Sequence, residues 1–376
     1  MKRTLLPLFF ALSLLLGGCG WLNGSFVSVT PHEAPKQVAH ADTITAANYK
    51  DFLAALKQLV AAGTEVAAIH VEEYPEKALE VGVRRAVYNV MHNDPIGAYA
   101  VEDIQYEIGS SSGLPAVSIT VTYRHNSTEL QRIRRAVSIP QVQIIVANAL
   151  ESYEAGIVLL VGQYEDTDFS QFVQDYAREH PETIMEVPQV TQALYGTGES
   201  RVVELIFSYQ TSRDSLRRMQ AQVKPVFESA VLYVSGDGDD YQKFSQLYAF
   251  LMERFDYKLE TSITPSYSLL RHGIGDSRAF AQVYAAMCRD AGLTCMTVTG
   301  TRDGEPWTWN MILDGEEYYH VDLLRCSERG KYRELTDEEM EGYVWDYSDY
   351  PACTGKPVPE LTDAEETQPT GNLEEF

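Results

Sequence analysis

Apolar and polar residues recur with two different periods along this chain, and the two periods predict a mixed α+β fold. Residues 117–123 are apolar at every second position, which is typical of a half-buried strand. Leu130, Ile133 and Val137 have the spacing of one face of a helix. The pattern predicts strands at 66–71, 101–106, 117–123, 157–161, 190–194 and 202–209, and helices at 76–92 and 169–179, with an amphipathic helix after each pair of strands.

The middle of the chain shows an internal repeat. Residues 117–137 match residues 202–223 in pattern, and Tyr123 aligns with Tyr209 at an offset of 86 positions that also holds upstream. A constant offset over such a length indicates two copies of one unit. We therefore predict two tandem βαββα modules, at 47–138 and 139–228, with helices against a sheet.

The C-terminal third has a different pattern. It predicts a strand at 227–234, a helix at 241–255, a second helix at 277–291 and a strand at 294–299. Asp276 is a suitable N-cap for the second helix, and Gly292 a suitable residue to end it. Residues 307–313 and 317–323 form a predicted hairpin around Asp314 and Gly315.

The N-terminus has the features of an export signal. Lys2 and Arg3 precede a short apolar run that closes on Gly17, Gly18 and Cys19. This ending resembles the lipobox of bacterial lipoproteins, which implies cleavage after residue 18 and lipid attachment at Cys19. We expect a signal peptide at 1–18, a flexible spacer at 19–46, and an extracytoplasmic protein held on a bacterial membrane by its lipid. The alternatives are an ordinary cleaved signal and an uncleaved anchor.

The charge excludes one class of partner. The formal net charge is −24, and it becomes −26 when Lys2 and Arg3 leave with the signal. Such a surface repels nucleic acid, so no nucleic-acid partner is expected. Residues 356–376 are acidic and contain Pro and Thr, which predicts a disordered tail.

Four cysteines remain beyond Cys19, an even number that permits two disulfides in an exported protein. We favour a pair between Cys326 and Cys353. Cys288 and Cys295 either pair or remain buried thiols. No CxxC spacing is present, so the sequence predicts neither a metal nor a cofactor.

Residues 229–355 resemble the transglutaminase-like superfamily, whose core is papain-like. The resemblance is carried by Gly275, Phe280-Ala281, Gly292, Val298-Thr299-Gly300, Trp309-Asn310, Gly315 and Tyr318-Tyr319-His320-Val321-Asp322. It implies a C-terminal α+β domain with a Cys–His–Asp triad for acyl transfer.

The resemblance also implies that this triad is degenerate. Its Cys position is Ser277, its His position is Trp307, and only Asp322 is retained. A Ser hydroxyl needs a positioned base, and an indole has only an N–H donor. We therefore expect a non-enzymatic domain that binds a peptide, a cell-wall glycan or an exported protein.

Two alternatives stay open. His320, two residues before Asp322, could act as the base for Ser277 in a serine hydrolase or acyl transferase, and His272 is a second candidate base. The tandem modules could instead make the protein a structural component of a surface assembly. Trp307, Trp309 and Tyr318 would line an aromatic cleft or, as we favour, fill it.

Overall fold

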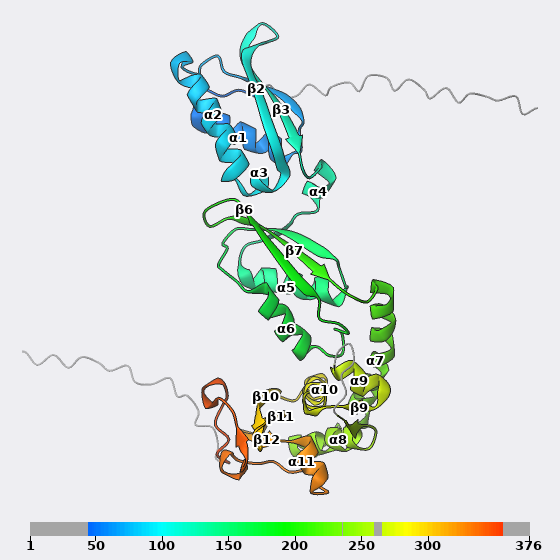
Figure 1. Cartoon of the computed structure of the whole chain (residues 1–376). Coiled ribbons are helices and arrows are strands. Elements are labelled where there is room, and N and C mark those ends of the chain that lie inside the picture. Colours follow the sequence, from blue (N-terminus) through cyan, green and yellow to red (C-terminus); the bar gives the residue numbers. More distant parts are fainter. Residues whose placement is uncertain (1–43, 235, 259–264, 356–376) are drawn as a thin grey trace, which may run out of the picture. The chain divides into compact units, whose positions relative to one another are not determined.

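The computed structural model describes residues 44–234, 236–258 and 265–355 (Figure 1). The predicted signal peptide, Cys19 and the acidic tail lie outside these residues, as does all of the predicted spacer except 44–46. Within the described residues, no helix combines the length and the apolar character needed to cross a bilayer.

The first α+β segment contains a three-stranded sheet with helices against it (Figure 1). Strand order is β1-β3-β2, and all pairs are antiparallel. Val117, Ile119 and Val121 are buried, as the alternating pattern predicts. The elements are α1 (Tyr49–Ala61), β1 (Val66–His70), α2 (Glu76–His92), α3 (Pro95–Ala100), β2 (Val101–Ser111), β3 (Leu114–Tyr123) and α4 (Ser127–Gln131).

The second segment contains a four-stranded sheet of order β4-β5-β7-β6. Its β5, β7 and β6 are antiparallel and follow the same order as β1, β3 and β2, whereas β4 joins β5 in parallel. The elements are β4 (Arg134–Ala136), α5 (Ile139–Glu151), β5 (Gly156–Val161), α6 (Phe169–Glu179), β6 (Gln189–Tyr195), β7 (Arg201–Ser208) and α7 (Arg213–Tyr233).

The sequence prediction is wrong at the end of the first segment. Instead of one helix through Val137, α4 ends at Gln131 and β4 begins at Arg134. Asn126 caps α4 in a capping box with Glu129, but the helix is short. Ala136 is buried because β4 pairs with β5. This apolar residue therefore enters the core from a strand at the edge of the sheet and not from a helix. Helices α1 and α5 have no counterpart in the sequence prediction.

The predicted strand at 227–234 is also wrong. Residues up to Tyr233 continue α7 through Pro225. Val223, Phe227 and Ala230 recur at helical spacing and enter the same core as α8 and α10. The predicted boundary between 228 and 229 therefore falls inside a helix.

In the C-terminal domain, the long buried helix α10 packs against strands β10 and β11 (Figure 1). Its main sheet has the order β12-β11-β10-β13, all antiparallel. Asp314 pairs with Glu317, so the hairpin turn lies where the Asp-Gly sequence predicts it. The elements are α8 (Asp240–Met252), β8 (Asp256–Tyr257), α9 (Pro265–His272), β9 (Ile274–Gly275), α10 (Ser277–Asp290), β10 (Cys295–Arg302), β11 (Glu305–Asp314), β12 (Glu317–Val321), α11 (Leu323–Glu328), β13 (Tyr343–Val344) and two short 3₁₀ turns, η1 (Asp337–Glu339) and η2 (Tyr347–Asp349).

Candidate active site

Ser277 is the first residue of α10. The Asp276 side chain caps this helix by accepting a hydrogen bond from the Ala279 N–H at 2.8 Å. Ser277 is 8% exposed, and its Oγ accepts a hydrogen bond from the backbone N–H of Thr308 on β11 at 3.3 Å. The hydroxyl thus lies at a helix N-terminus beside a strand, which is where the resemblance implies a nucleophile.

Trp307 lies on β11 and is partly exposed. Its Nε1–H donates a hydrogen bond to Oδ2 of Asp322 at 2.8 Å. The Arg302 guanidinium lies over the indole at 5.2 Å from the ring centroid, and the Tyr257 ring contacts it at 5.9 Å between centroids. The indole therefore makes the bond to Asp322 that a triad histidine would make, but it has no nitrogen able to take a proton.

Asp322 is 2% exposed and is the N-cap of α11. Its Oδ1 accepts the backbone N–H groups of Leu324 at 3.0 Å and Arg325 at 3.2 Å. Its Oδ2 accepts Trp307 and also the Tyr343 hydroxyl at 2.5 Å. Both oxygens are thus occupied by donors, as a buried carboxylate requires.

Two groups near Asp322 balance its charge. The Arg302 Nη1 lies 3.7 Å from Oδ2. Burial, followed by the charge of Asp322, raises the pKa of Tyr343 well above its ordinary value, so the phenol keeps the proton that it donates. The retained acid therefore caps a helix and joins two strands.

His320 does not reach Ser277. His320 and Asp322 do not lie on one strand, because β12 ends at Val321 and Asp322 is the N-cap of α11. His320 is fully buried; its Nδ1 accepts the Trp309 Nε1–H at 3.0 Å, and its Nε2 lies 2.9 Å from Oδ1 of Asp337. Both ring nitrogens are therefore taken by other partners.

These two contacts fix the tautomer of His320. An indole nitrogen can only donate, so Nδ1 is the acceptor and Nε2 carries the proton that goes to Asp337. Burial lowers the pKa of His320 below its ordinary value, although Asp337 opposes this shift. The ring is thus held neutral, with its proton directed to Asp337. His272, the other candidate base, is exposed at the end of α9, where its ring meets Tyr267 edge-on.

Sequence reasoning missed a second group of reactive residue types. Potential ligand atoms of His320, Asp337 and Cys353 lie within 4.8 Å of one another, and the Cys353 N–H donates to Asp337 Oδ2 at 3.0 Å. These donors suit zinc by type. A metal bound to Nε2 would, however, require the imidazole proton to be on Nδ1, where it would face the Trp309 N–H, another donor. The observed tautomer of His320 is therefore not the one that would bind a metal through Nε2. The spacing of the three residues in sequence gives no signal of this group.

The space around Ser277 is closed. The pocket formed by residues such as Ser277, Thr308, Asn310 and Asp322 has no volume open to a water-sized sphere. Trp309 is 1% exposed and lies in a core cluster with Tyr343 and Trp345, and Tyr318 packs against the same cluster. Trp309 also lines the closed pocket beside Ser277 and Asp322, whereas Trp307 donates to Asp322.

The predicted disulfide is not formed in this structure, in which Cys288, Cys295, Cys326 and Cys353 are all free thiols. Cys326 is buried on α11, where its sulfur accepts the Arg333 N–H at 3.3 Å. Cys353 belongs to the core cluster around Trp309.

Comparison with known proteins supports the assignment of this domain. Residues 229–323 match the model of the Transglutaminase-like superfamily. The chain therefore carries a transglutaminase-like domain, and Ser277, Trp307 and Asp322 all lie within the matched residues. No curated protein matches the chain by sequence.

Three solved structures resemble the chain. A protein from Cytophaga hutchinsonii, named as a cysteine protease, is 14% identical over 39% of this chain and 65% of its own, less than two thirds, with a TM-score of 0.26. A TGase is 8% identical over 61% of this chain and 67% of its own, with a TM-score of 0.26. A protein from Parabacteroides distasonis, named as a protease, is 10% identical over 72% of this chain and 40% of its own, with a TM-score of 0.21.

Proposed function

We propose that this chain is an extracytoplasmic lipoprotein in which the transglutaminase-like domain is catalytically inactive and serves binding or architecture. One observation carries the proposal. The Nε1–H of Trp307, at the position where the resemblance implies a histidine, donates to Oδ2 of Asp322 at 2.8 Å. A histidine there could take the proton of a nucleophile and pass it on, whereas an indole cannot accept one.

Among the residues that the structure describes, none accepts a hydrogen bond from the Ser277 hydroxyl. Its Oγ accepts the Thr308 N–H, and the closed space beside it leaves no room for a substrate carbonyl. An unassisted hydroxyl remains protonated and a poor nucleophile at neutral pH. Without the base, the loss in rate is several orders of magnitude.

The alternative serine hydrolase would use His320 as its base. That role requires one ring nitrogen to face Ser277, but the two nitrogens contact Trp309 and Asp337. Releasing either would leave a buried polar group without a partner, at a cost of about 1–3 kcal/mol. This geometry favours a structural role for His320.

A cysteine enzyme built from Cys353, His320 and Asp337 is the other candidate, since the three groups are adjacent. Its nucleophile would have to be a thiolate. Burial, followed by the charge of Asp337, raises the pKa of the Cys353 thiol to about 12, so the thiol is protonated at neutral pH. His320 cannot take that proton, because its Nε2 already carries a proton and its Nδ1 accepts a hydrogen bond from the Trp309 N–H.

Activity-based probes test the proposal. The full chain is treated with a fluorophosphonate and, separately, with iodoacetamide, and is assayed against amide and ester substrates. We expect no fluorophosphonate labelling at Ser277, no rapid alkylation at Cys353, and no turnover. Labelling that disappears in Ser277→Ala, or turnover that disappears in Cys353→Ser, would overturn the inactive assignment.

A restoring double variant tests the alignment of the positions. Ser277→Cys with Trp307→His reintroduces a thiol at the helix N-terminus and a base beside Asp322. We expect the introduced thiol of this double variant to be alkylated at least tenfold faster than the same thiol in Ser277→Cys alone. Equal rates in the two variants would mean that position 307 does not face position 277.

The membrane anchor is a separate part of the proposal and rests on the N-terminal sequence. Growth of a bacterial host with a radiolabelled fatty acid should label the wild-type chain and leave Cys19→Ala unlabelled. Label retained in Cys19→Ala would exclude lipid attachment at this residue.

We further propose that the two α+β segments are copies of one module. Their sheets share the order β1-β3-β2 and β5-β7-β6, which supports the offset of 86 positions in the sequence. If these modules provide the partner surface, as in the structural alternative, removal of residues 236–355, which begins after the end of α7, should leave partner binding intact. Loss of binding would place the surface in the transglutaminase-like domain.

A further inference from the structure

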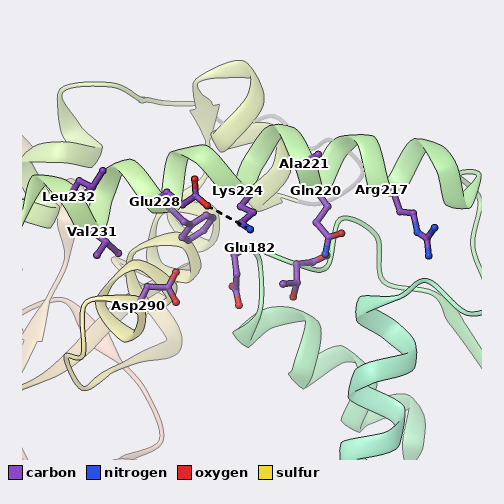
Figure 2. Close-up of a pocket in the computed structure, with 11 residues that line it drawn as sticks. Glu182, Arg217, Gln220, Ala221, Lys224, Glu228, Val231, Leu232 and Asp290 are labelled. Carbon is purple, nitrogen blue, oxygen red and sulfur yellow. Dashed lines mark hydrogen bonds and ion pairs between the residues drawn. The ribbon is translucent and has the colours of Figure 1, made fainter.

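A groove of about 970 Å³ runs along one side of α7, away from Ser277. Figure 2 shows its lining side chains, which come from α7, from the loop after α6 and from the end of α10. A hydrogen bond joins α7 to the loop after α6, because Gln220 Nε2 donates to the Thr183 carbonyl at 3.2 Å. The groove is thus a surface feature of the described residues and is independent of the closed pocket at Ser277.

One part of the groove is apolar. Phe227, at 3% exposure, forms its floor, whereas Leu232 is 85% exposed and Val231 is 36% exposed. Figure 2 places Val231 and Leu232 at the same end of the groove as Asp290. Single exposed leucines are common on protein surfaces, but this one borders a concave apolar surface large enough for several side chains.

Three carboxylates line the groove, and that of Glu228 is paired with Lys224 at 3.7 Å. The Glu182 Oε1 is held by Arg289 Nη2 at 2.8 Å and by His180 Nδ1 at 3.0 Å, but its Oε2 is buried with no hydrogen-bond partner. Asp290 lies at the end of α10, and partial burial together with the charge of Glu182 raises its pKa. This end of the groove thus lacks a hydrogen-bond donor for a buried carboxylate oxygen.

The cationic residues of the groove do not supply that donor. Lys224 is 73% exposed and is paired only loosely with Glu228, at 3.7 Å. Arg217 lies toward the other end of α7 in Figure 2. An arriving ammonium or guanidinium group would therefore find the carboxylates of Glu182 and Asp290 next to an apolar surface.

We infer that this groove binds a peptide segment in which a lysine or arginine adjoins a large apolar side chain. The cation would lie between the Glu182 and Asp290 carboxylates, while the apolar side chain would cover Val231 and Leu232. Burying one large apolar side chain contributes about 1.5–3 kcal/mol, and a charge-assisted bond adds to it. The inference rests on the binding role proposed above, and it needs no chemistry at Ser277.

A synthetic probe tests this inference. Fluorescein-labelled acetyl-Leu-Lys-Val-Leu-Lys-Leu-amide is titrated into the full chain and followed by fluorescence anisotropy, beside the same peptide with Glu in place of both Lys residues. We expect saturable binding of the Lys peptide that weakens with salt, and at least tenfold weaker binding of the Glu peptide.

Two variants and a matched control locate the binding. Leu232→Ser and Asp290→Asn should each lower the affinity for the Lys peptide at least tenfold. Leu194→Ser changes another exposed leucine, on β6, and should leave the affinity unchanged. Binding that survives both groove variants overturns this inference but leaves the proposed binding role standing, because the peptide then occupies another surface.

Two further outcomes would also overturn it. The first is no binding of either peptide to a chain whose circular dichroism and unfolding midpoint are those of a folded protein. The second is concentration-dependent self-association that Leu232→Ser abolishes, because the groove would then be covered by a second copy of the chain.

Discussion

Trp307 donates its indole N–H to Asp322 at 2.8 Å, so this buried carboxylate is held by a side chain that cannot accept a proton. The carboxylate also caps α11 and accepts a hydrogen bond from the Tyr343 hydroxyl. This pairing makes the effects of substitutions at both positions predictable.

Trp307→Phe should lower the free energy of unfolding by about 1–2 kcal/mol, because the buried Asp322 loses one of its donors. Urea unfolding of the full chain followed by circular dichroism measures the change. In an Asp322→Asn background the same substitution should cost less, since the charge that the indole stabilises is gone. An equal cost in both backgrounds would mean that the bond contributes nothing.

In Trp309→Phe, His320 should no longer be restricted to one tautomer. The variant keeps an aromatic ring in the core but removes the N–H that holds Nδ1 as an acceptor. Nitrogen-15 NMR of the imidazole should show Nε2–H alone in the wild type and a mixture of tautomers in the variant. Trp345→Phe is the matched control, because it changes the same cluster without touching the Nδ1 contact. Identical spectra for Trp309→Phe and the wild type would mean that the Trp309 N–H does not determine the tautomer of His320.

Gly300→Ala should destabilise the sheet of the C-terminal domain. An added Cβ at this position would collide with the Val344 carbonyl oxygen and approach the Trp309 ring at 3.1 Å. Overpacking of this kind costs about 1–3 kcal/mol. Gly109→Ala is the control, because a Cβ there meets no atom within 4 Å. Thermal unfolding should show a lower midpoint for the first variant and an unchanged one for the second, and similar midpoints would refute the steric argument.

Glu334 gives the stability a pH dependence. Burial, followed by the charge of Asp314, raises its pKa from 4.5 to about 7. The folded chain then binds this proton more tightly than the unfolded chain does, so the free energy of unfolding falls as the pH rises from about 4.5 through 7. The effect is reduced because the side chain is only partly buried.

Glu334→Gln removes this dependence. At pH 8 the variant should be more stable than the wild type by on the order of 1–2 kcal/mol, and the gap should close below pH about 4.5. Glu338→Gln, at an exposed position on the same loop, is the control and should follow the wild type. Parallel curves for Glu334→Gln and the wild type would show that the carboxyl titrates normally.

Much of the fold follows from local pattern. The period-two run at 117–123, the helical run of α10 and the Asp-Gly turn all appear where the sequence predicts them. The short apolar run at 227–234 is compatible with a strand or a helix, and only packing against α8 and α10 made it part of α7. The same holds for Ala136, whose burial depends on a partner strand that lies beyond a helix.

The sequence by itself determined that residue 307 is a tryptophan, whose indole cannot accept a proton, and that residue 277 is a serine. Only the tertiary structure decided where the remaining groups point. It directs His320 to Trp309 and Asp337, brings Cys353 beside them, and leaves Leu232 exposed above two carboxylates. Chemical identity is a property of each residue alone, whereas tautomer, burial and the shape of a groove depend on neighbours that are distant along the chain.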